Sequence, residues 1–223
     1  MPRRYLQRSL IFLWLAALLA VPLAVADDAI SPAEQRVFTD PHLDNLPATA
    51  TLHYRYRKNE AGQAAVDDDV LLSTQQDVEH GRVARVDFLH GERHLLLPET
   101  EQAVSNPLVL YFLESDVRGM HRRLGGQENY FRRRIRLALA DHAQLREVSF
   151  KYAGQVVHGQ QVTVQPFADD PLVERFQGTA RKAYVFTVSA QVPGSIYELR
   201  TRVDNPVGGG APLLEEILTL REP

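Results

Sequence analysis

One stretch of the sequence, residues 106–142, differs in its periodicity from the rest of the chain. Apolar residues recur in it at three- and four-residue spacing, which is the spacing of one face of an α-helix. The pair Gly125 and Gly126 divides the stretch, and glycine readily adopts the left-handed conformation with which many helices end. We therefore predict two helices joined at this pair, in a chain whose other segments are typical of strands and turns.

The start of the first predicted helix carries more apolar side chains than one narrow face requires. Asn106 and Pro107 form a helix start signal, because asparagine can cap free backbone N–H groups and proline suits the first turn. A surface this apolar favours burial on more than one side or contact with a ligand. The candidate ligand-pocket residues are Leu110, Tyr111, Leu113, Val117, Met120, Phe131 and Ile135.

The same two helices contain the densest group of cationic side chains in the chain. Its members are Arg118, Arg122, Arg123, Arg132, Arg133, Arg134 and Arg136. Guanidinium groups bind phosphate and carboxylate groups in a bidentate manner, which favours contact with an anionic ligand or an acidic partner surface. The alternative is a solvated helix face, with its charge balanced by Glu114, Asp116, Glu128 and carboxylates of the strands.

Outside the helical pair, alternation of apolar and polar residues predicts strands. In residues 49–57, Leu52, Tyr54 and Tyr56 fall on one face and basic residues on the other. Closely spaced hairpins of this kind favour an antiparallel meander of about nine strands, the fourth of them at residues 94–97. The fold class is therefore α+β. We expect a curved antiparallel sheet or half-barrel, with the helical hairpin packed on it or plugging it over an apolar hollow.

The first 26 residues have the pattern of a signal peptide. Arginines near the start precede the apolar run Leu10–Val25, and Ala24-Val25-Ala26 is a small-x-small cleavage pattern. We expect cleavage near Ala26 and secretion to the periplasm, with an uncleaved anchor helix as the alternative. Residues 27–223 suit a single domain, since no repeat or linker divides them.

Composition and motifs exclude several classes of function. The sequence contains no cysteine, which excludes disulfides, thiolate metal sites and thiol catalysis, and its net charge of −3 does not suit a nucleic-acid binder. His90 and His94 have a metal-like spacing, but a glycine turn follows His90, so we predict no metal site. The acidic run at residues 67–69 lacks the other ligands of a calcium loop. We also find no motif for a cofactor and no catalytic residues.

In architecture, the chain resembles the periplasmic outer-membrane lipoprotein carriers and their relatives. The signal peptide, the strand with Leu52, Tyr54 and Tyr56, the helical insert at residues 106–142 and a closing strand at residues 213–220 carry the resemblance. It implies an incomplete barrel with a helical lid and a role in carrying a lipid or lipoprotein. The position of the helical insert, after about four strands, departs from the family pattern. No family ligand residue can be placed on this sequence.

Three hypotheses follow for the function. The first is a non-catalytic periplasmic protein that carries or senses a lipid, an acylated protein or another apolar ligand. The second is an assembly or regulatory protein that docks on an inner- or outer-membrane protein complex through the basic helical hairpin. The third is a hydrolase that uses His90, Glu92 or Asp69.

Overall fold

The computed structural model describes residues 30–176, 178–206 and 210–223, so the predicted signal peptide lies outside the described residues. The strands are β1 (Thr49–Glu60), β2 (Val66–Asp77), β3 (Gly81–Phe88), β4 (Gln144–Tyr152), β5 (Gln155–Val164), β6 (Ala183–Val188), β7 (Ile196–Val203) and β8 (Leu214–Leu220). The helices are α1 (Pro32–Glu34), which continues into the short π-helix η1 (Gln35–Thr39), α2 (Leu108–Leu124) and α3 (Glu128–Asp141). Two 3₁₀ turns, η2 (Gly91–Arg93) and η3 (Val173–Phe176), complete the described elements.

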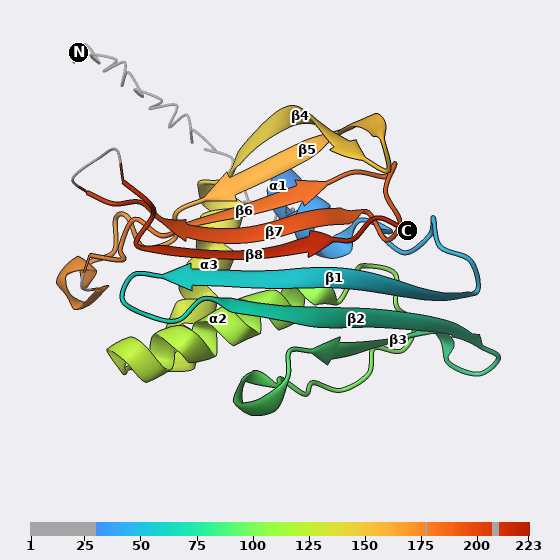
Figure 1. The fold of residues 1–223 in the computed structure, drawn as a ribbon, viewed down its shortest axis with the longest axis horizontal. Helices are drawn as coiled ribbons and strands as arrows, with labels where there is room; N and C mark the ends of the chain where they lie inside the picture. Colours follow the sequence, from blue (N-terminus) through green and yellow to red (C-terminus); the bar gives the residue numbers. More distant parts are fainter. Residues whose placement is uncertain (1–29, 177, 207–209) are drawn as a thin grey trace, which may run out of the picture.

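All the strands join one open antiparallel sheet in the order β3-β2-β1-β8-β7-β6-β5-β4 (Figure 1). It consists of two meanders, β1–β3 and β4–β8, which the pairing of β1 with β8 unites. Its edges, β3 and β4, come from the middle of the sequence, one on either side of the helical hairpin. The predicted α+β class with an antiparallel sheet is confirmed, and the sheet does not close into a barrel.

The described chain contains eight strands rather than the nine that we predicted. The predicted strand at residues 94–97 is wrong, because η2 follows β3 and only a single bridge, between Phe88 and Leu95, pairs the chain back. Leu89 and Gly91 both have positive φ values, which turn the backbone out of the ladder. The acidic run at residues 67–69 lies within β2, with Asp67 opposite Arg57.

Local signals explain where the helices begin and end. Ser31 and Glu34 form a reciprocal capping box at the start of α1. The side chain of Asn106 accepts a hydrogen bond of 3.1 Å from the Leu108 N–H at the start of α2. Gly125, with a φ of 68°, ends α2. None of the helices among the described residues is long and apolar enough to cross a bilayer.

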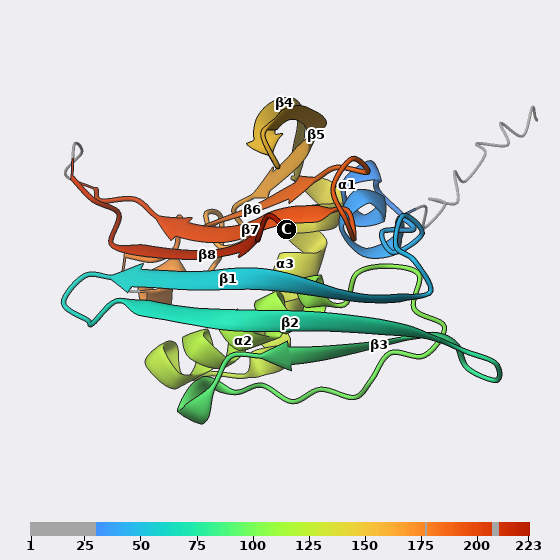
Figure 2. The ribbon, with the colours of Figure 1, turned by 45° about the vertical axis from the view of Figure 1, so that its right-hand side comes forward.

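Both long helices lie on the same face of the sheet, behind it in Figure 1 and again in the turned view of Figure 2. Alternation in β1 directs Tyr54 and Tyr56 towards the helices and leaves Arg55 on the solvent face, where it pairs with Asp67. Side chains fill the space between α2 and the sheet. The ring of Tyr111 lies 5.7 Å from that of Phe88, and Phe112 is 2 % exposed.

This packing corrects the predicted position of the apolar hollow. We expected the helices to cover an empty space on the sheet. Instead, large side chains with less than 2 % exposure occupy this layer, among them Tyr54, Leu72, Phe88, Tyr184 and Phe186. Periodicity in the sequence shows that a face is apolar but does not show how closely the opposing side chains fill the space.

Candidate functional site

An apolar groove of about 500 Å³ lies between α2, α3, η1 and the segment that precedes α2. We call it the outer groove. Its floor is formed by Val37, Val109, Leu113, Val117 and Ile135, and its rim includes Phe38, Leu97, Leu110, Arg132 and Arg136. The floor residues are nearly inaccessible to solvent, whereas Leu110 is 56 % exposed. The groove thus has an apolar base that water reaches from the outer side of the helices.

Helical periodicity places the outer groove away from the sheet. Tyr111 and Asp116 face the strands, as their contacts with Phe88 and Tyr184 show. Leu110, Leu113 and Val117 recur at three- and four-residue spacing on another face of α2. These residues face α3 and η1 rather than the sheet.

Two arginines at the rim differ in whether a described carboxylate pairs with them. Arg132 donates to both carboxylate oxygens of Glu114, at 2.9 and 2.8 Å, and to Glu128 at 2.6 Å. The hydrogen bonds from Arg132, and secondarily those from Arg118, lower the pKa of Glu114 despite its partial burial. Arg136 is exposed and has no ion pair within the described part of the chain. Arg136 is therefore the rim cation that is available to an anion.

The seven predicted arginines do not form one cationic cluster. Four of them pair with carboxylates: Arg118 and Arg132 with Glu114, Arg123 with Glu60, and Arg134 with Asp170. Arg122, Arg133 and Arg136 are exposed, without an ion pair to any described residue. Carboxylates of the helices, of a strand and of the 166–176 loop thus balance part of the basic charge. Asp116, which we expected among the balancing groups, pairs with Lys182 instead.

The predicted pocket residues separate into three groups. Leu110, Leu113, Val117 and Ile135 line the outer groove. Tyr111 and Met120 face the sheet: the Tyr111 hydroxyl donates to the Leu97 carbonyl at 3.0 Å, and the Met120 sulfur lies 3.9 Å from the Tyr184 hydroxyl. Phe131 lines a second, smaller pocket at the turn between α2 and α3.

Sequence reasoning missed a buried polar group that joins α2 to the sheet. Lys182 and Asp116 form an ion pair, and their side chains are 1 % and 3 % exposed. The Tyr184 hydroxyl donates to the other Asp116 oxygen at 2.5 Å, and burial together with the Asp116 charge raises the pKa of Tyr184. The available signal was an aspartate between Phe112 and Met120, at i+4 spacing on an apolar helix face.

The predicted hydrolase residues have other partners. The backbone N–H and ring Nδ1 of His90 contact Asp68, which raises the pKa of His90, mainly through the side-chain hydrogen bond. Asp69 pairs with Arg221, and Glu92 is exposed in η2. His94 lies 3.5 Å from Asp87. Within the described ranges, no three histidine or acidic side chains gather as metal ligands would.

Comparisons with known proteins include a weak likeness to a solved structure. No protein-family model matches the chain, and no curated protein matches it either. A LolA superfamily protein from Nitrosomonas europaea is 11 % identical over 84 % of this chain and 91 % of its own, with a TM-score of 0.21. This hit comes from the superfamily that the sequence resembles in architecture.

Proposed function

We propose that the protein is a non-catalytic carrier of an amphiphile, with an apolar chain lying in the outer groove and an acidic head group at Arg136. One observation carries the proposal. Two sets of residues that were predicted separately, the apolar Leu110, Leu113, Val117 and Ile135 and the basic Arg132 and Arg136, line the same groove.

The size and chemistry of the outer groove suit an acyl chain. Its volume of about 500 Å³ falls within the roughly 300–1,000 Å³ that is usual for small-molecule sites. Each buried methylene contributes about 0.8 kcal/mol, so a medium-length chain offsets the cost of immobilisation. Because the groove is open on its outer side, a ligand can enter without separation of the helices from the sheet.

The charges at the rim favour an acid over a base. The cationic Arg136 is unpaired within the described residues, whereas the nearby carboxylate of Glu114 already accepts hydrogen bonds from two arginines. A carboxylate or phosphate can pair with Arg136 at no cost to an existing ion pair. Together with the predicted signal peptide, this supports a periplasmic carrier of a lipid or an acylated protein.

Uptake of a fluorescent fatty acid tests the proposal. The variant Leu110→Glu places a carboxylate in the groove at an exposed position, so the fold should be retained and the affinity should fall by about tenfold or more, or about 1.4 kcal/mol. Leu137→Glu is the matched control, because Leu137 is an exposed leucine of α3 outside the groove. A wild-type protein that takes up no fatty acid, or equal losses in both variants, would contradict the proposal.

The free arginines also support a second candidate function, docking on an acidic surface of a membrane protein complex. Arg122 and Arg133 are exposed, without ion pairs among the described residues, and lie outside the outer groove. We expect the wild-type protein to cross-link to a stoichiometric envelope partner, and a variant with Arg122→Glu and Arg133→Glu to lose it while still binding fatty acid. If cross-linking is unchanged in this variant, the hairpin is not the docking surface.

A further inference from the structure

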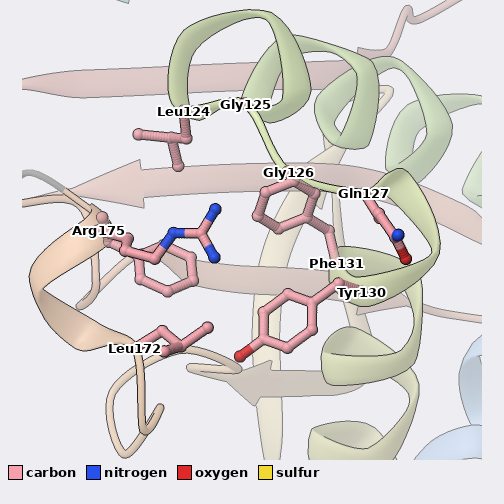
Figure 3. A pocket seen from close by; sticks show the side chains of 9 residues that line it. Leu124, Gly125, Gly126, Gln127, Tyr130, Phe131, Leu172 and Arg175 are labelled. Carbon is pink, nitrogen blue, oxygen red and sulfur yellow. The ribbon is translucent and has the colours of Figure 1, made fainter.

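A second pocket, of about 270 Å³, lies at the turn between α2 and α3 (Figure 3). We call it the turn pocket. Its walls come from the end of α2, the start of α3 and the loop that contains η3. None of its residues lines the outer groove, so the two sites can be altered separately.

Aromatic rings form much of the wall of the turn pocket. Tyr130, Phe131 and Phe176 face it, together with Leu124 and Leu172. The rings of Phe131 and Phe176 lie edge to face with their centroids 6.3 Å apart, and those of Tyr130 and Phe131 do so at 6.0 Å. This arrangement offers ring faces and edges to a flat apolar group.

A buried carboxylate fixes the loop that forms one wall. The Asp170 side chain is fully buried and accepts hydrogen bonds from the Tyr130 hydroxyl, at 2.7 and 2.8 Å, and from the Leu172 N–H at 2.8 Å. Arg134 pairs with the same carboxylate at 2.9 Å. Because Asp170 already has these partners, it does not offer a negative charge to a ligand, and the pocket wall is formed in advance.

The pocket contains one cation that is not engaged within the described part of the chain. Figure 3 shows the Arg175 side chain extending across the pocket towards Gly126. A Cβ atom at Gly126 would lie 3.3 Å from the Arg175 guanidinium, and Gly126 has a φ of 84°. Arg175 is exposed and forms no ion pair with a described residue. Its guanidinium therefore lies beside the aromatic wall, and its N–H donors have no partner among the described residues.

We propose that the turn pocket binds a small aromatic carboxylate, with its ring against Tyr130, Phe131 and Phe176 and its carboxylate on Arg175. An aromatic ring fits the edge-to-face wall, and a guanidinium binds a carboxylate through two parallel hydrogen bonds. The volume is below the usual range of drug-sized sites, which favours a ligand of one or two rings over a long acyl chain.

Titration calorimetry with indole-3-acetate and its neutral analogue indole-3-acetamide tests this proposal. We expect the acid to bind at least about tenfold more tightly than the amide. The variant Arg175→Gln should remove this preference and leave binding of the amide unchanged. Arg133→Gln, which removes an exposed arginine of α3 outside the pocket, should leave both affinities unchanged.

Three results would overturn the proposal: no binding of indole-3-acetate, equal affinities for acid and amide, or equal effects of the two arginine variants. Leu110→Glu separates this site from the outer groove, since it should weaken fatty-acid binding by about tenfold or more and leave binding of indole-3-acetate intact. Failure of either site can therefore be recognised without reference to the other.

Discussion

At the scale of residues, the most informative side chains are polar groups within the apolar layer between sheet and helices. Lys182 and Asp116 are removed from water almost completely, so each charge depends on the other. Tyr184 satisfies the second oxygen of Asp116. Such a group contributes little net stability, but it fixes the position of α2 relative to β6, because any displacement would separate two buried charges.

Loss of one partner of this pair should destabilise the fold strongly. We expect Lys182→Met and Asp116→Leu each to lower the free energy of unfolding by about 3–5 kcal/mol, since each leaves an unpaired buried charge. The double variant should be more stable than either single variant. Urea unfolding of the four proteins measures this coupling, and additive losses would show that the two charges do not depend on each other.

At the scale of elements, one buried histidine joins the N-terminal segment to the start of α2. His42 is 1 % exposed, and its Nδ1 accepts a hydrogen bond of 3.2 Å from the Asn106 N–H. Its Nε2–H donates to the Arg36 carbonyl at 2.9 Å. Asn106 in turn donates to the Gly194 carbonyl at 2.9 Å, so η1, α2 and the β6–β7 turn meet at this point.

The neutral form of His42 predicts a dependence of stability on pH. Burial, the main cause, lowers its pKa below 6.5, against the opposing hydrogen bond to Arg36 and the charge of Asp40. Between the lowered pKa and about pH 6.5, His42 therefore binds a proton in the unfolded chain but not in the folded chain. The contribution of His42 to stability is therefore complete above about pH 6.5 and is lost as the pH falls towards the lowered pKa.

Comparison with the variant His42→Asn isolates this contribution. His80 and His90, whose pKa values are raised by Asp77 and Asp68, act in the opposite sense in both proteins and cancel in the difference. We expect the stability advantage of the wild-type protein to be larger at pH 7.5 than at pH 5. An advantage that is independent of pH would rule out this role for His42.

Much at the element scale was predictable from the sequence, because it depends on local rules. Helical spacing and the glycine pair predicted α2 and α3, and alternation predicted β1. The position of the outer groove was not predictable. Leu110 and Leu113 have the same character in the sequence. In the fold, α3 and η1 pack so that Leu113 is buried and Leu110 stays exposed. The turn pocket depends likewise on Asp170, which resembles an ordinary loop carboxylate in the sequence.

At the scale of the whole molecule, the packed layer between sheet and helices locates the candidate sites. Since large side chains fill that layer, the outer groove and the turn pocket both lie at the borders of the hairpin, where helices meet other segments. Ligand exchange at either site therefore requires no opening of the core. No described residue that lines either site belongs to a strand, which explains why the strand pattern alone contained no signal for them.

The union of β1 with β8 also has a consequence for the order of assembly. Tyr54 lies opposite Leu220, and Glu60 lies opposite Leu214, so the central ladder joins residues that are distant along the chain. As the chain enters the compartment in which it folds, N-terminus first, the first meander has an unsatisfied backbone edge until the final strand has arrived. Contacts of such long separation slow folding and prolong exposure of that edge. A nascent chain of this design would therefore gain from a chaperone that covers β1 until β8 arrives.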